Sequence, residues 1–225
     1  MPATQIELTR VTRRYDAIAV LDGLDLRVAE GEFLVLLGRS GSGKSTLLNL
    51  IAGIDVPDSG SVRVAAQEIS RLGDGARTRF RRRAVGLVFQ QFNLVPTLTV
   101  TENLLLPLQL AGIAATGQVE AMLERLGLNG KGGRYPEALS GGEQQRVAIG
   151  RALIHDPPVV LADEPTGALD LETGREVLAL LDDLVRARGR TLVMATHARE
   201  VIGYADRVVT IRGGRIEDRE VDAGA

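Results

Sequence analysis

Apolar and polar positions along the chain follow two different patterns. Over the first thirty residues they alternate in short runs broken at Gly23 and Gly31, which predicts antiparallel strands joined by tight turns. Four later runs are continuously apolar, as expected for parallel strands that are covered on both faces. These runs are EFLVLLG from Glu32, AVGLVF from Ala84, PVVLADE from Pro158 and RTLVMATH from Arg190.

Apolar residues at helical spacing occupy the remaining regions. In TGREVLALLDDLVRARG they recur from Val177 to Leu184, and Gly189 ends the pattern. This helix leads directly into the last buried run, and a helix followed by a buried strand is typical of a parallel sheet. Near the end, Gly213 and Gly214 stand between two alternating segments, which predicts a hairpin.

The distribution of the two patterns predicts how the chain is organised. Between Gln90 and Pro157 the strand-like runs stop and helical patterns replace them, for example in GQVEAMLERLGL. We therefore expect an α/β core formed by residues 1–89 and 156–225, with a parallel sheet and an N-terminal antiparallel β part. Residues 90–155 would form a helical lobe inserted into this core, and the two parts together would make one domain.

Composition excludes several classes of protein without identifying a partner. The 225 residues are 44% hydrophobic and 25% charged, with a formal net charge of −2, which gives no overall field that would attract nucleic acid or anionic lipid. No cysteine is present, so disulfides and thiolate metal sites are excluded. The longest apolar segment, LLLPLQLAGIAA from Leu104, is shorter than the roughly 20 apolar residues that span a bilayer. We expect any membrane span to come from a separate chain.

One basic stretch, RTRFRRR from Arg77 to Arg83, resembles the clusters found in nucleic-acid-binding proteins. It directly precedes the strand predicted from Ala84, so we interpret it as the solvated end of a helix. We expect no nucleic-acid partner.

The stretch GRSGSGKST matches the pattern G-x-x-x-x-G-K-[ST] and lies between the strand EFLVLL and the apolar helix KSTLLNLIAGI. Its glycines let successive N–H groups point at phosphate oxygens, the helix start adds a positive dipole, and Lys44 would reach the outer phosphates. Ser45 would bind Mg²⁺. Alone, the motif indicates only that a nucleoside triphosphate binds, because kinases, GTPases and motors share it. The fold class that we predict is α/β, a P-loop nucleoside triphosphatase with a RecA-like core. The residues expected to contact the nucleotide here are Gly38, Arg39, Ser40, Gly41, Ser42, Gly43, Lys44, Ser45 and Thr46.

Two adjacent acids, Asp163 and Glu164, end the buried strand in VVLADEP. This is the edge at which α/β sheets gather their ligands. Neighbouring residues on a strand point in opposite directions, so the two acids should have different roles. We expect Asp163 to hold Mg²⁺ and Glu164 to act as the general base for an attacking water.

A second stretch with the character of an anion site, LSGGEQQRVAIGRAL, begins at Leu139. Its helix would start with Ser140, Gly141 and Gly142, but it has no lysine. Taken alone, a serine N-cap followed by two glycines is explained equally well as a structural helix start.

Six motifs in a fixed order resemble those of ATP-binding cassette (ABC) proteins, and they cover almost the whole chain. They are GRSGSGKST, LVFQQFN, LSGGEQQR, VVLADEP, GALD and LVMATH. The resemblance implies that the chain hydrolyses ATP with Mg²⁺ and that two copies pair head to tail. Each ATP would lie between the phosphate cradle of one copy and Ser140, Gly141 and Gly142 of the other.

Further roles follow from this resemblance alone. Tyr15 would stack on the adenine, and Gln90 would contact Mg²⁺ or the attacking water. His197 would contact the γ-phosphate and steady Glu164. Asp170, in GALD, would face the second copy.

Two residues depart from the generic signature. Glu143 replaces a glutamine, although a carboxylate in the first turn suits the helix dipole, and we keep it in the nucleotide-binding set. Gly150 lies inside the predicted helix, at a cost of about 1 kcal/mol relative to alanine.

The runs VFQQFNLVPTLTVTENLLLPL and EPTGALDLETG resemble the small ATPases that serve lipoprotein release and macrolide or peptide export. This implies a cytoplasmic protein held at the inner face of the cell membrane by a separate permease. A permease helix would contact the region from Gln90 to Pro96, where Phe92, Leu94 and Val95 are apolar, although packing inside the lobe explains these residues equally well. The same motifs also fit a cell-division ATPase with a permease-like partner.

Overall fold

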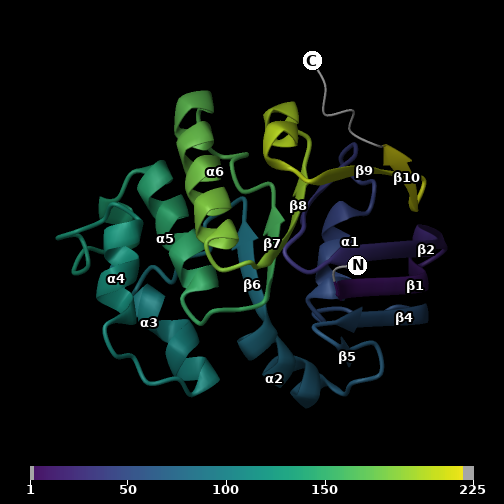
Figure 1. Ribbon diagram of the computed structural model, residues 1–225, viewed down its shortest axis with the longest axis horizontal. Helices are drawn as coiled ribbons and strands as arrows, with labels where there is room; N and C mark the ends of the chain where they lie inside the picture. Colours follow the sequence, from purple (N-terminus) through teal and green to yellow (C-terminus); the bar gives the residue numbers. More distant parts are fainter. Residues whose placement is uncertain (1–2, 220–225) are drawn as a thin grey trace.

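The computed structural model describes residues 3–219 and contains two sheets (Figure 1). The larger has six strands in the order β10-β9-β3-β8-β7-β6, and all neighbours are parallel except β10 and β9. Its strands are β3 (Phe33–Leu37), β6 (Val85–Phe89), β7 (Val159–Asp163), β8 (Thr191–Thr196), β9 (Arg207–Arg212) and β10 (Arg215–Arg219). The predicted parallel sheet and the hairpin at Gly213 and Gly214 are confirmed.

The smaller sheet is antiparallel, with the order β2-β1-β4-β5. Its strands are β1 (Thr4–Tyr15), β2 (Ile18–Ala29), β4 (Ser59–Val64) and β5 (Gln67–Glu68). The first hairpin turns at Asp16, where φ is +52°, and not at Gly23. The predicted break at Gly23 is therefore wrong. Gly23 lies inside β2 with a φ of +61° and donates its N–H to Thr12 Oγ1, because the pairing of β1 with β2 is irregular there.

The helices lie mostly on one side of the larger sheet, at the left of Figure 1. They are α1 (Lys44–Ile51), α2 (Asp74–Ala84), α3 (Val100–Ala111), α4 (Gln118–Arg125), α5 (Gly141–Leu153) and α6 (Leu171–Arg186), with short 3₁₀ turns at Pro136–Ala138 and Arg199–Tyr204. Ala84 ends α2, so the strand predicted from it starts one residue later. The basic stretch Arg77 to Arg83 lies within α2, as predicted, and its one aromatic residue, Phe80, is buried.

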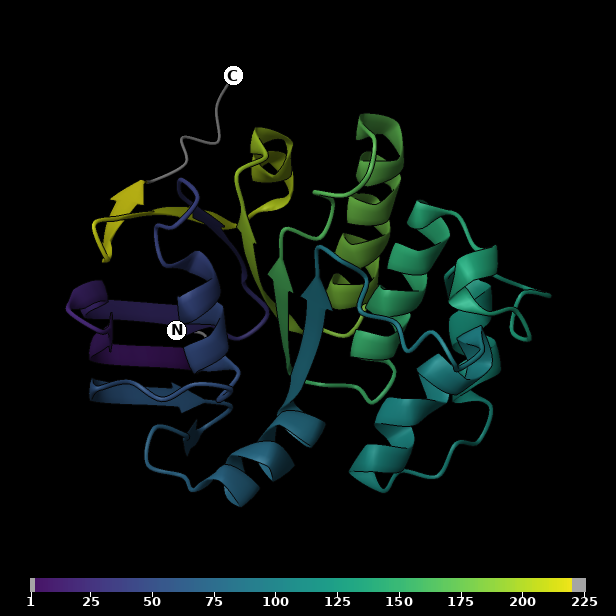
Figure 2. The ribbon, with the colours of Figure 1, turned by 180° about the vertical axis from the view of Figure 1, so that it is seen from behind.

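Opposite faces of the larger sheet pack against different partners. Along β3, Val35 packs toward helices α3 to α6, whereas Leu34 and Leu36 pack with α1 and the smaller sheet. All six residues of β8 are buried, which explains its continuous apolar run. Helix α1 lies between the two sheets, as the view from behind shows (Figure 2).

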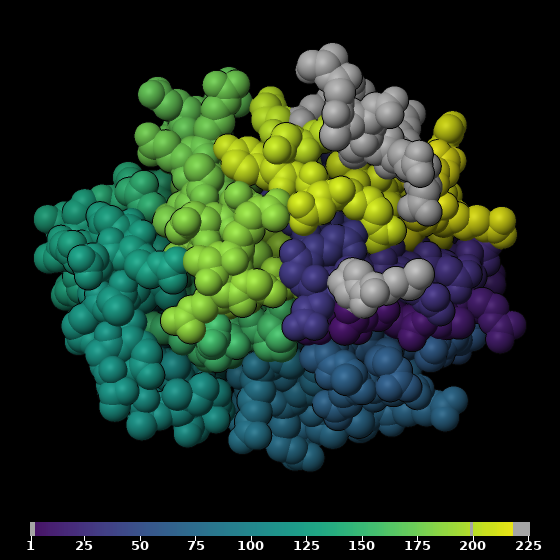
Figure 3. Space-filling model, viewed as in Figure 1, coloured from purple at the N-terminus to yellow at the C-terminus, as the bar shows by residue number. Residues whose placement is uncertain are grey.

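Helix α5 packs against α3 and α6 and also against the core strand β6. Gly150 allows this close packing, because an added Cβ would lie 2.5 Å from Leu126 Cδ1 and 3.0 Å from Leu104 Cδ2. The cost of a glycine inside the helix is therefore offset by tighter contact with its neighbours. Figure 3 shows the teal surface of α3 and α4 on the side opposite the purple strands of the smaller sheet. Within residues 3–219, no helix is long and apolar enough to cross a membrane.

Candidate functional site

The loop between β3 and α1 forms a phosphate cradle at the carboxyl edge of the larger sheet. Gly41 and Gly43 have φ values of +76° and +101°, which favour glycine. A Cβ on Gly43 would lie 3.0 Å from the carbonyl oxygen of Val20, so this position also lacks room for a side chain. No side chain caps the start of α1. Its first N–H groups are therefore available to an anion.

Lys44 lies over this loop and is only 8% exposed. Its Nζ donates to the carbonyl oxygens of Gly38 at 2.8 Å and Arg39 at 3.4 Å. The same Nζ lies 3.9 Å from Glu164 Oε1. The lysine charge is thus held between the cradle and Glu164, the acid that directly follows β7.

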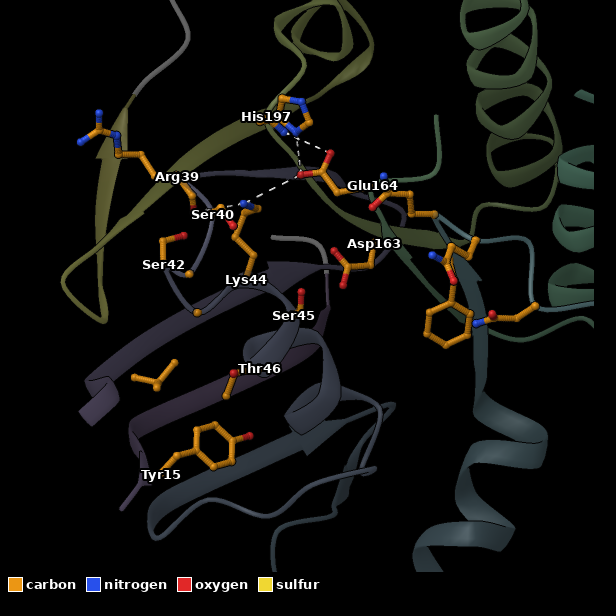
Figure 4. Close-up of a pocket in the computed structure, with 17 residues that line it drawn as sticks. Tyr15, Arg39, Ser40, Ser42, Lys44, Ser45, Thr46, Asp163, Glu164 and His197 are labelled. Atoms are coloured by element: carbon orange, nitrogen blue, oxygen red, sulfur yellow. Dashed lines mark hydrogen bonds and ion pairs between the residues drawn. The ribbon is translucent and has the colours of Figure 1, made fainter. Parts of the chain in front are cut away.

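Residues at the end of β8 fix the orientation of the Glu164 carboxylate. Its Oε2 accepts from Thr196 Oγ1 at 3.1 Å and from the N–H of His197 at 3.3 Å, and its Oε1 lies 3.0 Å from His197 Nδ1. Glu164 has a φ of +47°, a conformation that costs about 1 to 3 kcal/mol for a residue other than glycine. Figure 4 shows Lys44, Glu164 and His197 facing one another. Three contacts therefore hold this carboxylate in one orientation at the cavity.

One cavity of about 1030 Å³ collects most of the predicted site residues (Figure 4). The predicted residues that line it are Tyr15, Arg39, Ser40, Gly41, Ser42, Gly43, Lys44, Ser45, Thr46, Gln90, Asp163, Glu164 and His197. Gly38 lies next to it and accepts the bond from Lys44. Val20, Phe89, Gln91 and Asn93 also line the cavity and were not predicted from the sequence.

Tyr15 lies at the edge of this cavity and is 43% exposed. Its hydroxyl donates to Asp55 Oδ2 at 2.9 Å, and the guanidinium of Arg13 lies 4.8 Å from the centre of its ring. The position of the ring is therefore fixed by two polar contacts. Its stacking on adenine remains a prediction.

The signature residues lie outside this cavity. Among the residues that the structure describes, Ser140, Gly141, Gly142, Glu143 and Asp170 are absent from its lining. Ser140 is the exposed N-cap of α5, and its Oγ accepts from the backbone N–H of Glu143 at 3.3 Å. In turn, Oε2 of that glutamate accepts from the serine N–H at 2.9 Å, which completes a capping box.

Asp170 has a similar structural role at the start of α6. Its Oδ1 accepts from the backbone N–H of Thr173 at 3.0 Å, and this bond lowers the pKa of the Asp170 carboxyl. A second hollow contains Asp170 together with Glu164 and His197. Asp170 thus lies beside the catalytic candidates while its carboxylate caps a helix.

Two residues of α5 that no sequence motif indicated hold the ends of β6 and β7 and the loop after β6. Gln145 is completely buried and donates its amide to the carbonyl oxygens of Pro165 at 2.5 Å and Phe89 at 3.2 Å. Arg151 donates to the carbonyl oxygen of Asn93 at 2.7 Å. Their partners are distant in sequence, so the only signal available was a polar side chain on the apolar face of a predicted helix.

The cradle after β3, the buried lysine and the acid that follows β7, two strands away in the same sheet, define a P-loop nucleoside triphosphatase. Residues 21–167 match the family model described as ABC transporter. The chain therefore belongs to the ABC transporter family as an ATP-binding subunit, and it is an ATP hydrolase of the ABC type.

Curated relatives agree with this family. The chain is 52% identical over 200 residues to an uncharacterised ABC transporter ATP-binding protein of Mycobacterium tuberculosis. The aligned region covers 88% of this chain and 81% of that protein. It is 41% identical to the macrolide export ATP-binding/permease protein MacB of Chlorobaculum tepidum, covering 95% of this chain but 34% of that protein. It is also 45% identical to the methionine import ATP-binding protein MetN of Rhizobium johnstonii, covering 94% of this chain and 59% of that protein.

A solved structure has the same fold. It is the dimeric structure of a post-hydrolysis state of the ATP-binding cassette MJ0796 bound to ADP and Pi, and it matches with a TM-score of 0.89 at 39% identity. The match covers 98% of this chain and all of that chain. The α/β fold class predicted from the sequence is confirmed.

Proposed function

We propose that this protein is the ATPase of an ABC transporter of the export or mechanotransmission type. Two copies would pair head to tail around two Mg-ATP and drive a separate membrane permease. One observation carries the proposal: the exposed start of α5 lies outside the cavity that holds Lys44 and Glu164. A second copy would supply the missing side of each site. The dimer reported for MJ0796 with ADP and Pi supports this arrangement.

Within one copy, the residues of the cavity would divide the chemistry. Lys44 and the amides at the start of α1 would hold the phosphates, because both present positive charge to the cavity. Glu164 would take the proton of the attacking water, while His197 keeps its carboxylate oriented. The adenine would stack on Tyr15 at the cavity edge.

A magnesium site fits the donors that line the cavity. Ser45, Gln90 and Asp163 offer a hydroxyl, an amide and a carboxylate oxygen, which are ligands that Mg²⁺ prefers. When bound, Mg²⁺ would neutralise charge on the phosphates.

Across the interface, Ser140, Gly141 and Gly142 of the second copy would donate to the γ-phosphate. Glu143 would stay beside this contact in the first turn of α5. Asp170 would face the second copy, and its neighbour Leu171, which is 59% exposed, would be covered by the pairing. Loss of the γ-phosphate would then weaken the clamp.

The permease would dock on the loop from Gln90 to Pro96. In this loop Phe92 and Leu94 are half-buried, and the carbonyl oxygen of Phe92 accepts from Arg151 at 3.2 Å. A permease helix on the loop would therefore act on α5, whose start faces the other nucleotide. This arrangement would hold the protein at the cytoplasmic face of the cell membrane.

Copurification tests this function. The tagged Glu164→Gln protein is purified from detergent-solubilised membranes, and the proteins that come with it are identified. An export permease supports the proposal. A cell-division partner would instead support the non-transport role. An import permease would contradict the proposed export direction, and this result is possible because MetN is as similar to this chain as MacB.

A matched pair of variants tests the docking site. Replacing Phe92 by aspartate should abolish stimulation of ATP hydrolysis by the permease and leave ATP binding by the isolated chain intact. Ile54 is exposed and lies outside the docking loop. Replacing it by aspartate makes the same kind of change and should leave stimulation intact. Equal stimulation of the two variants would contradict this docking site.

A further inference from the structure

The sequence contains only two lysines, and each lies beside one of the two helix starts discussed above. Lys44 belongs to the cradle. Lys131 lies in a tight turn before α5, where its N–H donates to the carbonyl oxygen of Leu128 at 3.0 Å and its own carbonyl oxygen accepts from Arg134 at 3.0 Å. The turn directs its ammonium to Glu143, with which it forms a hydrogen-bonded ion pair.

The two oxygens of the Glu143 carboxylate have different partners. Oε1 of Glu143 contacts Lys131 Nζ, and Oε2 accepts from the N–H of Ser140. The glutamate side chain is 15% exposed and that of the lysine 31%. The hydrogen bond from Lys131 lowers the pKa of Glu143, so the carboxylate is charged at neutral pH.

The capping box also determines what Ser140 can offer. Its Oγ already accepts from the N–H of Glu143, so the hydroxyl hydrogen is left to donate outward, where the residue is exposed. The N–H groups of Gly141 and Gly142 have no partner within the helix by geometry. The start of α5 therefore has an exposed serine hydroxyl and two N–H groups without a helical partner, with the negative charge of Glu143 in the same turn.

We propose that Lys131 is a positioning residue for the contact between α5 and the γ-phosphate of a nucleotide bound by the second copy. It neutralises Glu143, which would otherwise repel the phosphate, and it holds the carboxylate that orients Ser140. This inference rests on the head-to-tail dimer of the proposed function. The start of α5 would thus also use a lysine, but this lysine contacts the Glu143 carboxylate and not the phosphate.

A purely structural role makes a different prediction. If the ion pair only fastens the turn before α5 to the helix, then removing either partner or both should weaken the contact to the same extent. If charge is what matters, the loss of Lys131 should be harmful only while Glu143 is charged. A double variant separates these two cases.

The test measures ATP-driven dimerisation of the full chain in the Glu164→Gln background. Mg-ATP is titrated, and the mass is followed by light scattering after gel filtration. Lys131→Met should raise the ATP concentration for half-maximal dimerisation about tenfold, the size expected for one charge at a helix start. Lys131→Met with Glu143→Gln should return it to within about twofold of the parent. The tenfold effect should shrink as salt is raised.

Arg27→Met is the matched control. It removes a cation from an ion pair with Glu7 on the antiparallel sheet, where the arginine side chain is 77% exposed. This variant should dimerise like the parent. Lys131→Arg, which keeps the charge, should do the same, and it serves if Lys131→Met fails to fold.

Three outcomes would overturn the inference. They are equal weakness of the single and double Lys131 variants, weakness of Arg27→Met equal to that of Lys131→Met, or a Lys131→Arg variant as weak as Lys131→Met. Failure of the Glu164→Gln parent to dimerise with Mg-ATP is a different result, because it would contradict the proposed function itself.

Discussion

Helices α1 and α5 both begin at glycine-containing turns whose first N–H groups have no helical partner, but only the start of α1 is complete, in that a lysine lies directly over it. The start of α1 has a glycine N-cap with no side-chain cap, and the buried Lys44 lies directly over it. The start of α5 is capped by its own serine and carries a carboxylate in its first turn, and its lysine lies 12 residues before that carboxylate in the sequence. The first arrangement can hold a phosphate within one chain. The second, being exposed and already capped, suits a contact with a charge that another copy brings and later loses.

The largest expected effect is a loss of hydrolysis that leaves both helix starts unchanged. Glu164→Gln removes the general base but keeps the size of the side chain, so turnover should fall by about 10² to 10⁴. ATP binding and pairing should persist. Phosphate release and nucleotide binding measure the two properties, with Glu120→Gln, an exposed change on α4, as the control. Hydrolysis at the parent rate would remove Glu164 from the mechanism.

The complete helix start is broken by Lys44→Met. Removal of a buried charge that contacts phosphate should weaken ATP binding by about 2 to 5 kcal/mol, measured by calorimetry. Ser140→Asp breaks the other start: aspartate keeps the N-cap but repels a phosphate. This variant should bind ATP as a single chain and fail to pair.

Mixing these two defective proteins tests how the sites are shared. In a mixed dimer, one site receives both defects and the other receives none. About half of the dimers in a 1:1 mixture should be mixed, and in each of these one of the two sites is intact. The mixture should therefore regain roughly a quarter of the parent hydrolysis. A mixture as inactive as its components would indicate that each chain completes its own site.

The connection between the two helix starts is broken by Gln145→Leu. This change leaves two buried carbonyl oxygens, of Phe89 and Pro165, without their donor. The free energy of unfolding should fall by about 1 to 3 kcal/mol, and kcat should fall more than KM changes, because the ends of β6 and β7 lose their anchor. Denaturant unfolding and steady-state kinetics measure this, with the exposed change Gln109→Leu as the control. A loss of stability with unchanged kcat would limit Gln145 to a structural role.

The smallest effect is expected at the adenine end. Tyr15→Ala should weaken ATP binding by about 1 kcal/mol, at the lower end of the range for base stacking, because the ring is already shared with Arg13. Tyr15→Phe removes only the hydroxyl that donates to Asp55 and should bind ATP more tightly than Tyr15→Ala. Equal binding by the two variants, measured by calorimetry, would show that the ring does not stack on the base.

The sequence predicts the complete helix start well because its parts are contiguous. Strand, glycine loop, lysine and helix follow one another within twenty residues, and the buried strands show as uninterrupted apolar runs. The hairpin was misplaced because an irregular pairing accepts Gly23 inside a strand. Strand β4 was missed because SGSVRV has only two apolar residues and its pairing with β1 is remote in sequence.

The parts of the site that escaped prediction depend on contacts between distant segments. Gln145 contacts a carbonyl 56 residues away, and its place on the apolar face of α5 is the only local sign of that buried role. Lys131 looks like an ordinary surface lysine until the fold brings it to Glu143. Periodicity reports which face of a helix is buried, but it does not report which backbone a buried amide will reach.

The structure of Glu164→Gln protein with Mg-ATP, bound to its membrane partner, tests the central claim most directly. The decisive quantity is the distance from Ser140 Oγ to the γ-phosphate of the nucleotide that the other copy's Lys44 holds. We predict a hydrogen bond, at about 2.5 to 3.0 Å, in each of two sites. A nucleotide enclosed wholly by one copy, with Ser140 far from any phosphate, would contradict the account.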